Sequence, residues 1–320
     1  MSSLRFAILG KSQLAAQRCQ AIARHAGAQI VSTWAPDDVA DFTEDNWREA
    51  FDPARIDAVI LALPPHLAAT ASLWALGAGI HVLSELPGGL SVEDIINLRR
   101  AERDSDAILK FGCSLRYHES VRAAVDLVRA EPYGKLLTAR AVYGHAGFPS
   151  ADAEQQGILI GHGIHMLDLL HLFCGPFESV KAMAPDEPGS GSNLFAIMKA
   201  GSGALAQLHA SATAWRQTFR LELGYEEGYV WLDGHLPGLE AYGPEMLIHA
   251  PLSRDRDGTP RPNPAESVSE FTRIDFADQE LAEFIDALAG RGSICHGTSH
   301  HAFDAMNIAQ RICAATETWA

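Results

Sequence analysis

Hydrophobic residues in the first third of the chain alternate between short continuous runs and longer helical patterns. A continuous apolar run is typical of a parallel strand covered on both faces, whereas apolar residues three or four apart indicate one face of a helix. A run of the first kind predicts a strand at residues 4–9, and further strands are predicted at 29–33, 58–63, 80–84 and 107–111. Helical spacing predicts helices at residues 13–26, 67–76 and 92–103. These repeated strand–helix units predict a Rossmann-like, doubly wound parallel sheet.

The pattern changes after residue 118. Strand-like runs now follow one another with no helix between them, which predicts an open, mainly antiparallel sheet. These runs lie at 180–184, 193–199, 204–211, 219–223 and 228–232, and one long strand is predicted before them at 136–144. Helices are predicted at 120–130, 161–173, 276–288 and 302–316, and a mobile loop rich in Pro, Asp and Arg at 254–267.

The predicted fold class is therefore α/β, in two domains. A Rossmann-like domain is expected at residues 1–116. A second α/β domain is expected at residues 117–320, with its C-terminal helix packing back on the first domain.

The end of the fourth predicted strand carries candidate chemistry. The strand must stop at Pro87, which has no backbone N–H to donate to a ladder. Ser91, followed by Glu93 and Asp94, predicts a helix N-cap with acidic residues in the first turn. In an open parallel sheet, ligands bind outside such strand ends. By itself this stretch also fits an ordinary strand–helix turn.

Three stretches together resemble the Gfo/Idh/MocA family of NAD(P)-dependent sugar and polyol oxidoreductases. They are residues 62–66 (Ala-Leu-Pro-Pro-His), residues 80–90 around Glu85-Leu86-Pro87, and residues 112–118 (Gly-Cys-Ser-Leu-Arg-Tyr-His). In that family the fourth strand normally ends Glu-Lys-Pro, and the lysine reaches both nicotinamide and substrate. This chain has Leu86 at the lysine position. The likeness spans the whole chain.

A dinucleotide fingerprint is expected after the first strand, where glycines allow a tight turn and a close approach to the pyrophosphate. The chain keeps Gly10 and has Ser12 and Ala15 at the second and third glycine positions. A serine there can donate to phosphate, and the helix N-terminus supplies a positive end. The predicted cofactor-binding residues are Gly10, Ser12, Leu63, Pro64, His66 and Glu85.

The choice between NAD and NADP stays open. The carboxylate that binds the ribose is expected at the end of the second strand, at the position of either Trp34 or Ala35, and neither residue is acidic. The first carboxylate is Asp37, inside the next turn, and no convincing basic pair for a 2′-phosphate is found.

Residues 157–171 are the second informative run. The resemblance places Gly163, His165 and Asp168 on a helix pattern of the family, whose first aspartate is here Gly161. Helical geometry puts His165 and Asp168 on neighbouring faces, where Asp168 could orient the imidazole. Histidine, with an ordinary pKa near 6.5, suits proton exchange with a hydroxyl. His165 and Asp168 are the predicted catalytic residues; bracing of a buried helix is the alternative.

Three further residues are predicted to contact a substrate: Arg116, His118 and His162. For Arg116 and His118, packing at a hinge between the domains is an equal alternative. A metal site is not expected. His162, His165, Asp168 and His171 recur at every third position, so they drift around a helix by about 60° per step and cannot converge on one ion.

Composition restricts the partners. The net charge of −15 over 320 residues argues against nucleic acid. No apolar run approaches the roughly 20 residues of a membrane helix, and no signal peptide precedes the first strand. The five cysteines are scattered, which is typical of reduced thiols in a cytoplasmic protein. The resemblance implies a small-molecule substrate and a homo-oligomer formed through the C-terminal sheet.

The resemblance implies an NAD(P)-dependent oxidoreductase acting on a CH–OH or carbonyl group of a sugar-like or cyclic polyol substrate. Leu86 and Gly161, however, carry no group that can move a proton. Two alternatives therefore stay open. One is a non-redox enzyme, such as a lyase or cyclase, on the same fold. The other is a catalytically silent partner subunit.

Overall fold

The computed structural model describes residues 3–34, 51–130, 133–146, 157–185, 192–234, 244–272 and 276–318. Contacts within the chain form two compact units. The first contains Met1–Tyr117 and Asp275–Asn307, and the second contains His118–Ile274 and Ile308–Ala320. A C-terminal segment thus belongs to the first unit, and the last long helix contributes residues to both.

The first unit is built on a five-stranded sheet in which every described pair of strands is parallel. Its order is β2-β1-β3-β4-β5, so the chain reverses its direction across the sheet at β1. The predicted Rossmann-like sheet is confirmed. The strands are β1 (Leu4–Leu9), β2 (Ala28–Trp34), β3 (Ala58–Leu61), β4 (His81–Glu85) and β5 (Leu109–Gly112).

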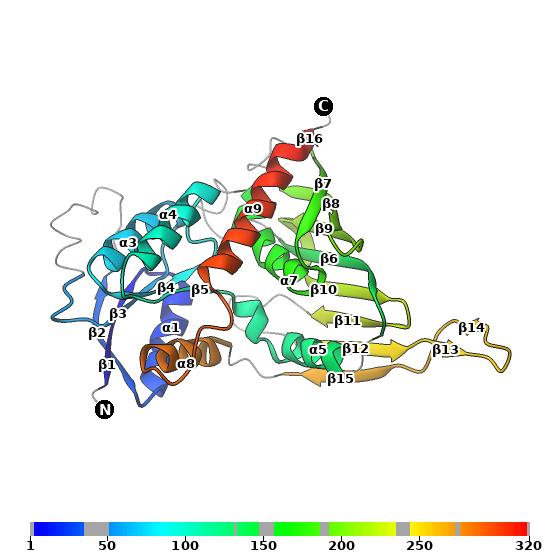
Figure 1. Ribbon diagram of the computed structural model, residues 1–320, viewed down its shortest axis with the longest axis horizontal. Coiled ribbons are helices and arrows are strands. Elements are labelled where there is room, and N and C mark those ends of the chain that lie inside the picture. Colours follow the sequence, from blue (N-terminus) through cyan, green and yellow to red (C-terminus); the bar gives the residue numbers. More distant parts are fainter. Residues whose placement is uncertain are drawn as a thin grey trace. The chain divides into compact units, whose positions relative to one another are not determined.

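Helices cover both faces of this sheet (Figure 1). Helices α3 and α4 pack together on one face, and α1 and α8 pack together on the other. They are α1 (Gln13–Arg24), α3 (Pro65–Gly77), α4 (Val92–Arg103) and α8 (Phe276–Leu288). The predicted cap of α4 is confirmed, since Ser91 and Asp94 form a reciprocal capping box. A short 3₁₀ helix, η2 (Ser114–Tyr117), ends the first stretch of the unit.

The second unit is built on a nine-stranded sheet of order β15-β12-β11-β10-β6-β9-β8-β7-β16. It is mainly antiparallel, as predicted, with parallel pairing between β6 and β9 and between β7 and β16. Its strands are β6 (Leu136–Ala146), β7 (Phe177–Ala184), β8 (Asn193–Ala200), β9 (Leu205–Ser211), β10 (Thr213–Tyr225), β11 (Gly228–Gly234), β12 (Glu245–Pro251), β15 (Ser267–Phe271) and β16 (Thr316–Thr318).

One face of the nine-stranded sheet carries helices. Helix α5 (Glu119–Ala130) packs on β11, β12 and β15, and helix α7 (Ile164–Cys174) packs on β6 and β9. Helix α9 (Ser299–Ala315) leads into β16. Among the described helices, none combines the length and the apolar character that a membrane crossing requires.

Three sequence-based expectations differ from the structure. The patterns did not predict β12, β15 or β16. The expected mobile loop at 254–267 instead includes a small hairpin of β13 (Ser253–Arg254) and β14 (Pro260–Arg261), whose pairing depends on a turn and not on hydrophobic alternation. The helix expected from residue 161 is already helical at residues 157–158, continues as a π-helix, Leu159–Gly163, and is α-helical again from Ile164.

Candidate functional site

The carboxyl ends of the parallel strands lie at one edge of the first unit. The register aligns Leu9 at the end of β1 with Leu61 at the end of β3, and Leu61 with Ser84 near the end of β4. The predicted cofactor residues end or follow these strands: Gly10, Ser12, Leu63, Pro64, His66 and Glu85. Because the chain reverses at β1, this edge is also the topological switch point at which open α/β sheets bind ligands.

The turn after β1 requires glycine. Gly10 has φ +127°, and a Cβ there would lie 2.2 Å from the carbonyl oxygen of Ala62. Its N–H donates to the carbonyl oxygen of Trp34 at 2.8 Å, which ties the turn to β2. The Ser12 hydroxyl accepts a hydrogen bond from the N–H of Ala15 at 3.2 Å and so caps α1. A hydroxyl that accepts one hydrogen bond can still donate another.

The N-terminus of α1 is open to solvent. Lys11, Ser12 and Gln13 are all exposed, and the helix that follows runs for 12 residues. The first N–H groups of a helix and its dipole together favour an anion such as a pyrophosphate. The residues at this turn therefore fit a dinucleotide.

The other predicted cofactor contacts at this edge are Leu63, Pro64 and His66. His66 is exposed in the first turn of α3, after the half-buried Leu63 and Pro64. Trp34 is half-buried at the end of β2, the position at which dinucleotide-binding sheets carry the ribose-binding carboxylate. Ala35 and Asp37 lie outside the described residues.

Two neighbouring residues at the end of β4 have different environments. The Glu85 side chain is 13 % exposed and accepts a hydrogen bond from Nε of Arg18 at 2.8 Å. Leu86, at the position where the resembling family has lysine, is only 8 % exposed. The lysine position is therefore apolar and buried, and it holds no group that carries a proton.

The sequence analysis did not single out Arg18, whose side chain is fully buried in the structure. Its Nη2 donates to Oε2 of Glu280 on α8 at 2.5 Å. Burial alone would lower the pKa of Arg18, but Glu85 and Glu280 outweigh this effect and raise the pKa above its ordinary value. The missed signal was a basic residue on the buried face of α1, in phase with Ala15 and Ile22.

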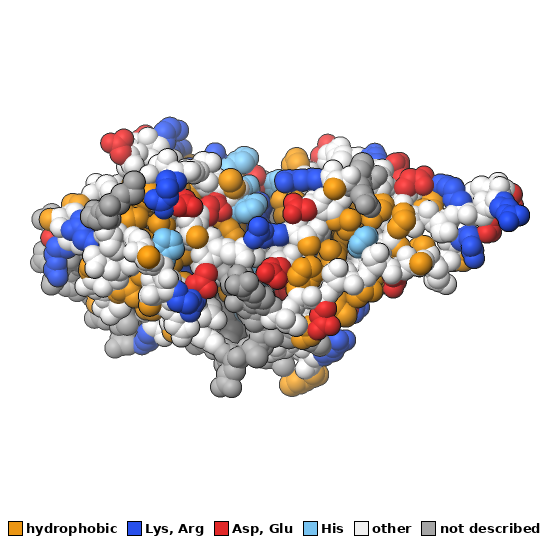
Figure 2. All heavy atoms as spheres, turned by 90° about the horizontal axis from the view of Figure 1, so that it is seen from below, with side chains coloured by type: hydrophobic (Ala, Val, Ile, Leu, Met, Phe, Trp, Pro, Cys, Tyr) orange, Lys and Arg blue, Asp and Glu red, His pale blue; other side chains and the backbone are white. Residues whose placement is uncertain are grey.

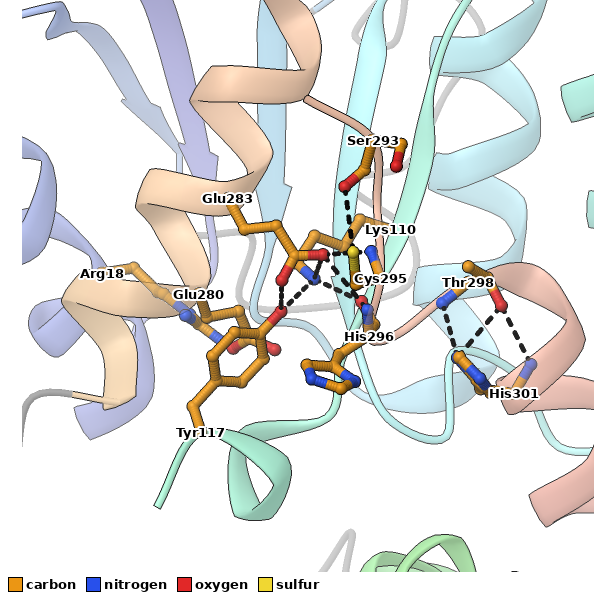
Figure 3. Close-up of polar contacts among 10 residues, drawn as sticks. All are labelled: Arg18, Lys110, Tyr117, Glu280, Glu283, Ser293, Cys295, His296, Thr298 and His301. Atoms are coloured by element: carbon orange, nitrogen blue, oxygen red, sulfur yellow. Dashed lines mark hydrogen bonds and ion pairs between the residues drawn. The ribbon is translucent and has the colours of Figure 1, made fainter. Parts of the chain in front are cut away.

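A second buried cluster lies nearby in the same unit (Figure 3). Nζ of Lys110, on β5, donates to Oη of Tyr117 at 2.7 Å and to the carbonyl oxygen of His296 at 2.5 Å. Tyr117 donates to Oε2 of Glu283, and Oε1 of Glu283 accepts the N–H groups of Cys295 and His296. These bonds hold the segment before α9 along β5, the edge strand of the sheet.

The predicted catalytic pair lies in the second unit. His165 is half-buried and Asp168 is 2 % exposed, both on α7. His162, predicted to contact substrate, lies one turn earlier in the π-helix, whose i→i+5 hydrogen bonds make it wider than an α-helix. Gly163 between them lets the helix approach β9, since a Cβ there would lie 3.3 Å from Cβ of Ala210.

The two remaining predicted substrate residues are buried where the chain passes from the first unit to the second. Arg116 is 5 % exposed in η2 and His118 is 7 % exposed. Nδ1 of His118 lies 2.6 Å from Oε1 of Glu245 on β12, and Ser120 donates to the other oxygen of Glu245. The hydrogen bond to Glu245 gives His118 a role in packing. Its contact with substrate stays a prediction.

The environment of Glu245 predicts an acid-dependent stability. Burial raises the pKa of Glu245, but the hydrogen bond and charge of His118 and the hydrogen bond from Ser120 outweigh it, so the pKa lies below 4.5. A carboxyl whose pKa is lower in the folded state stabilises the protein above its unfolded pKa, and this contribution is lost as the pH falls through the folded pKa. We therefore expect the free energy of unfolding to fall below about pH 4.5, and the fall to be smaller in Glu245→Gln.

Denaturant unfolding at a series of pH values measures this effect. At neutral pH, Glu245→Gln should cost about 2 kcal/mol, because a buried charged hydrogen-bond partner is removed. Glu270→Gln, an exposed change on the neighbouring strand β15, is the matched control. Equal acid slopes in the wild type and in Glu245→Gln would contradict the assignment.

The described residues contain no group of three or more His, Cys, Asp or Glu side chains that could hold a metal ion. This includes the described part of α7, where His165, Asp168 and His171 recur at every third position.

Comparison with known proteins identifies two regions of the chain. Residues 4–113 match a family model described as "Oxidoreductase family, NAD-binding Rossmann fold". Residues 121–231 match a model described as "GFO/IDH/MocA C-terminal domain". The two matches follow one another in the order of the two units and together cover most of the chain.

Individual relatives are distant. Inositol 2-dehydrogenase 2 of Saccharopolyspora erythraea is 26 % identical over 213 residues, which are 64 % of this chain and 62 % of that protein. 2,7-Anhydro-N-acetylneuraminate hydratase of Escherichia coli is 26 % identical over 195 residues, 56 % of this chain and 50 % of that protein. The chain thus spans about half to three fifths of the length of the curated relatives it matches.

A solved structure shares the whole fold. The 3-ketoreductase of Actinomadura kijaniata, in complex with NADP and TDP-benzene, superposes with a TM-score of 0.78 at 18 % identity. The match covers 99 % of each chain.

Proposed function

Because this chain belongs to the Gfo/Idh/MocA family of oxidoreductases, we propose that it is an NAD(P)-dependent oxidoreductase acting on a sugar-like or cyclic polyol substrate. The observation that carries the proposal is the carboxyl edge of the first sheet. There the turn at Gly10, the open N-terminus of α1 and the Glu85 carboxylate follow the ends of neighbouring parallel strands.

Different residues at this edge would bind different parts of a dinucleotide. Gly10 and Ser12 would take the pyrophosphate with the N-terminus of α1, while Leu63, Pro64 and His66 border the nucleotide from the end of β3 and the start of α3. Glu85 would accept hydrogen bonds from the nicotinamide half. A bound nicotinamide supplies the hydride acceptor or donor.

The second unit would handle the substrate's proton. In this proposal the imidazole of His165 removes or returns the proton of the reacting hydroxyl, and Asp168 orients that imidazole from the next turn of α7. Arg116, His118 and His162 are the candidate substrate contacts. Leu86 is buried and has no group that can exchange a proton. We therefore assign the proton transfer to His165.

Cofactor titration tests the proposal. NADH and NADPH are added separately to the purified protein, and binding is followed by nicotinamide fluorescence and by calorimetry. We expect saturable binding of at least one of them below millimolar concentration. Absence of binding of both at millimolar concentration would overturn the proposed function.

A second candidate function is a non-redox reaction on the same fold, such as elimination or hydration. It is favoured by the apolar Leu86 and by the likeness to a protein named as a hydratase. The two candidates differ in one measurement. An oxidoreductase changes the absorbance of the nicotinamide in proportion to product, whereas a net non-redox reaction forms product with no net change in the cofactor.

We also propose self-association through the outer face of the nine-stranded sheet. The strand register places Phe195 beside His209 on β8 and β9, and Trp231 beside Ile248 on β11 and β12. Phe195 and His209 stack with ring centroids 4.0 Å apart. The exposed large apolar residues of this sheet include Leu137, Met183, Phe195, Ile197, Leu205, Trp231, Met246 and Val268.

The charges of this face are balanced, which would allow a second copy to meet it. Between the apolar strands at its two ends, Arg140 pairs with Glu222 and Arg220 pairs with Asp233. Over the whole side of the molecule that Figure 2 draws, acidic, basic and apolar side chains of the described residues are interspersed. Large exposed apolar patches on soluble proteins mark interaction sites.

A charge placed on this face should break the association. We expect Ile197→Glu, at a side chain that is 59 % exposed on β8, to convert an oligomer to the monomer, because an interface cannot bury an unpaired carboxylate cheaply. Light scattering after size-exclusion chromatography measures the mass. Leu73→Glu, at an exposed apolar residue of α3, is the control and should leave the mass unchanged. A monomeric wild type would contradict the proposal.

A further inference from the structure

Arg18 lies at the centre of a buried ionic cluster that joins three elements of the first unit. From α1 it donates through Nε to Oε1 of Glu85 at the end of β4, and through Nη2 to Oε2 of Glu280 on α8. The side chains of Arg18 and Glu280, which lie next to each other in Figure 3, are both fully buried. Glu280 thus fixes the arginine side chain, and the arginine in turn holds the Glu85 carboxylate.

The two carboxylates are not equivalent. Glu280 is enclosed, whereas the Glu85 side chain is 13 % exposed at the edge where the strands end. A carboxylate has about four lone-pair sites for hydrogen bonds, and Arg18 occupies one of its two oxygens. Glu85 therefore keeps acceptor capacity, and Arg18 determines the orientation in which that capacity is presented.

Gly112 gives the Glu85 carboxylate its room. It ends β5 directly beside Glu85 in the register, and a Cβ there would lie 2.2 Å from Oε2 of Glu85. The same Cβ would lie 3.3 Å from Nη2 of Arg18. A methyl group at this position would thus displace the carboxylate without removing any charge, which makes residue 112 an independent test of where Glu85 must lie.

Stability alone does not account for this arrangement. Burying an ion pair costs desolvation energy that the pairing often fails to recover, and apolar replacements of similar volume are often neutral or stabilising. Arg24 joins the same two helices through an exposed pair with Asp278 at 2.8 Å, so a charged link between α1 and α8 also exists without the desolvation cost. What the buried arginine adds is a carboxylate held in one orientation at the strand end.

We propose that Arg18 is a positioning residue for the cofactor: it holds the Glu85 carboxylate so that Glu85 accepts a hydrogen bond from a hydroxyl or amide group of the nicotinamide half. This inference rests on the proposed function, because it requires a dinucleotide at the carboxyl edge of the sheet. Arg18 itself need not touch the cofactor.

Calorimetric titration with NADH and NADPH tests the inference without an assay of turnover. We expect Arg18→Met to raise the dissociation constant about tenfold or more, the effect of losing one hydrogen bond to a charged group. Arg18→Lys should weaken binding less, since it keeps the charge but loses the planar fork that spans two carboxylates. Arg24→Met, on the same helix, is the control and should bind like the wild type.

A double-mutant cycle separates positioning from a general loss of structure. In the Glu85→Gln background, Arg18→Met should cause little further loss of affinity, because the group that Arg18 positions has already been altered. A general structural role predicts that the two losses multiply. Thermal unfolding of each variant shows whether a change in affinity follows a change in stability.

Each outcome decides the question. If Arg18→Met lowers the melting temperature but leaves the dissociation constants unchanged, the proposal is wrong. If Arg18→Met does not fold, Gly112→Ala takes its place, and unchanged affinity in that variant would overturn the proposal. If the wild type binds neither NADH nor NADPH, the proposed function fails as well. If the wild type binds and Glu85→Gln binds equally well, the positioning role alone fails.

Discussion

Replacing Gly10 with alanine is expected to destabilise the first unit by about 3 kcal/mol and to abolish dinucleotide binding. The residue has φ +127°, and the new Cβ would lie 2.2 Å from the carbonyl oxygen of Ala62. An alanine here would therefore have a strained backbone, and its Cβ would clash with a backbone carbonyl of the segment after β3. A backbone carbonyl cannot rotate away as a side chain can. The turn that leads into the N-terminus of α1 must move, and any pyrophosphate site there moves with it.

Gly79→Ala separates these two contributions. Gly79 also has a positive φ, +74°, but a Cβ there would meet nothing within 4 Å. It should cost only the strain of the left-handed conformation, about 1 to 2 kcal/mol, and should leave cofactor binding intact. Urea unfolding and calorimetric titration with NADH measure both properties. If the two variants were equally stable and bound cofactor equally well, the clash at Gly10 would have no consequence.

His165→Asn is expected to reduce turnover by about 100-fold or more, the usual contribution of a positioned acid–base group, while cofactor binding stays close to that of the wild type. An asparagine keeps a polar side chain of similar size on α7 but cannot exchange a proton at neutral pH. The measurement is the rate of nicotinamide reduction with inositol and related cyclic polyols as probes, together with the dissociation constant for NADH.

The same helix offers the control for this variant. His171 lies two turns further along α7 and is also half-buried, so His171→Asn makes the same chemical change without touching the proposed proton acceptor. It should retain turnover. A His165→Asn enzyme that turns over a probe at the wild-type rate would show that the proton is handled elsewhere. Asp168 would then lose its assigned role as well.

Most of the architecture could be predicted from the sequence because hydrophobic periodicity is a local property. The apolar runs at 4–9 and 58–63 correspond to β1 and β3, and the cap at Ser91 was predicted with the correct start of α4. A strand buried on both faces has to be apolar along its length, so it can be recognised without knowledge of its neighbours. Strands such as β15 escaped because four of their five residues are exposed and polar or charged side chains dominate.

Residue types at strand ends were also sufficient to locate the candidate cofactor edge. Gly10 and Glu85 stand directly after or at the end of apolar runs, and parallel strands bring all such ends to one side of a sheet. The sequence also showed what is missing, since Leu86 and Gly161 replace groups that the resembling family uses.

The tertiary structure alone decided which charged residues surround that edge. Arg18 and Glu280 are 262 positions apart, and neither stands out in its own helix beyond being a charge on a buried face. Their pairing depends on α1 and α8 packing on the same face of one sheet, a contact between distant segments that no local pattern encodes. Hydrophobic periodicity could show that these helices exist and which face is buried. Only the packed fold could show that this face encloses an arginine between two carboxylates, one of which, Glu85, lies at the end of β4.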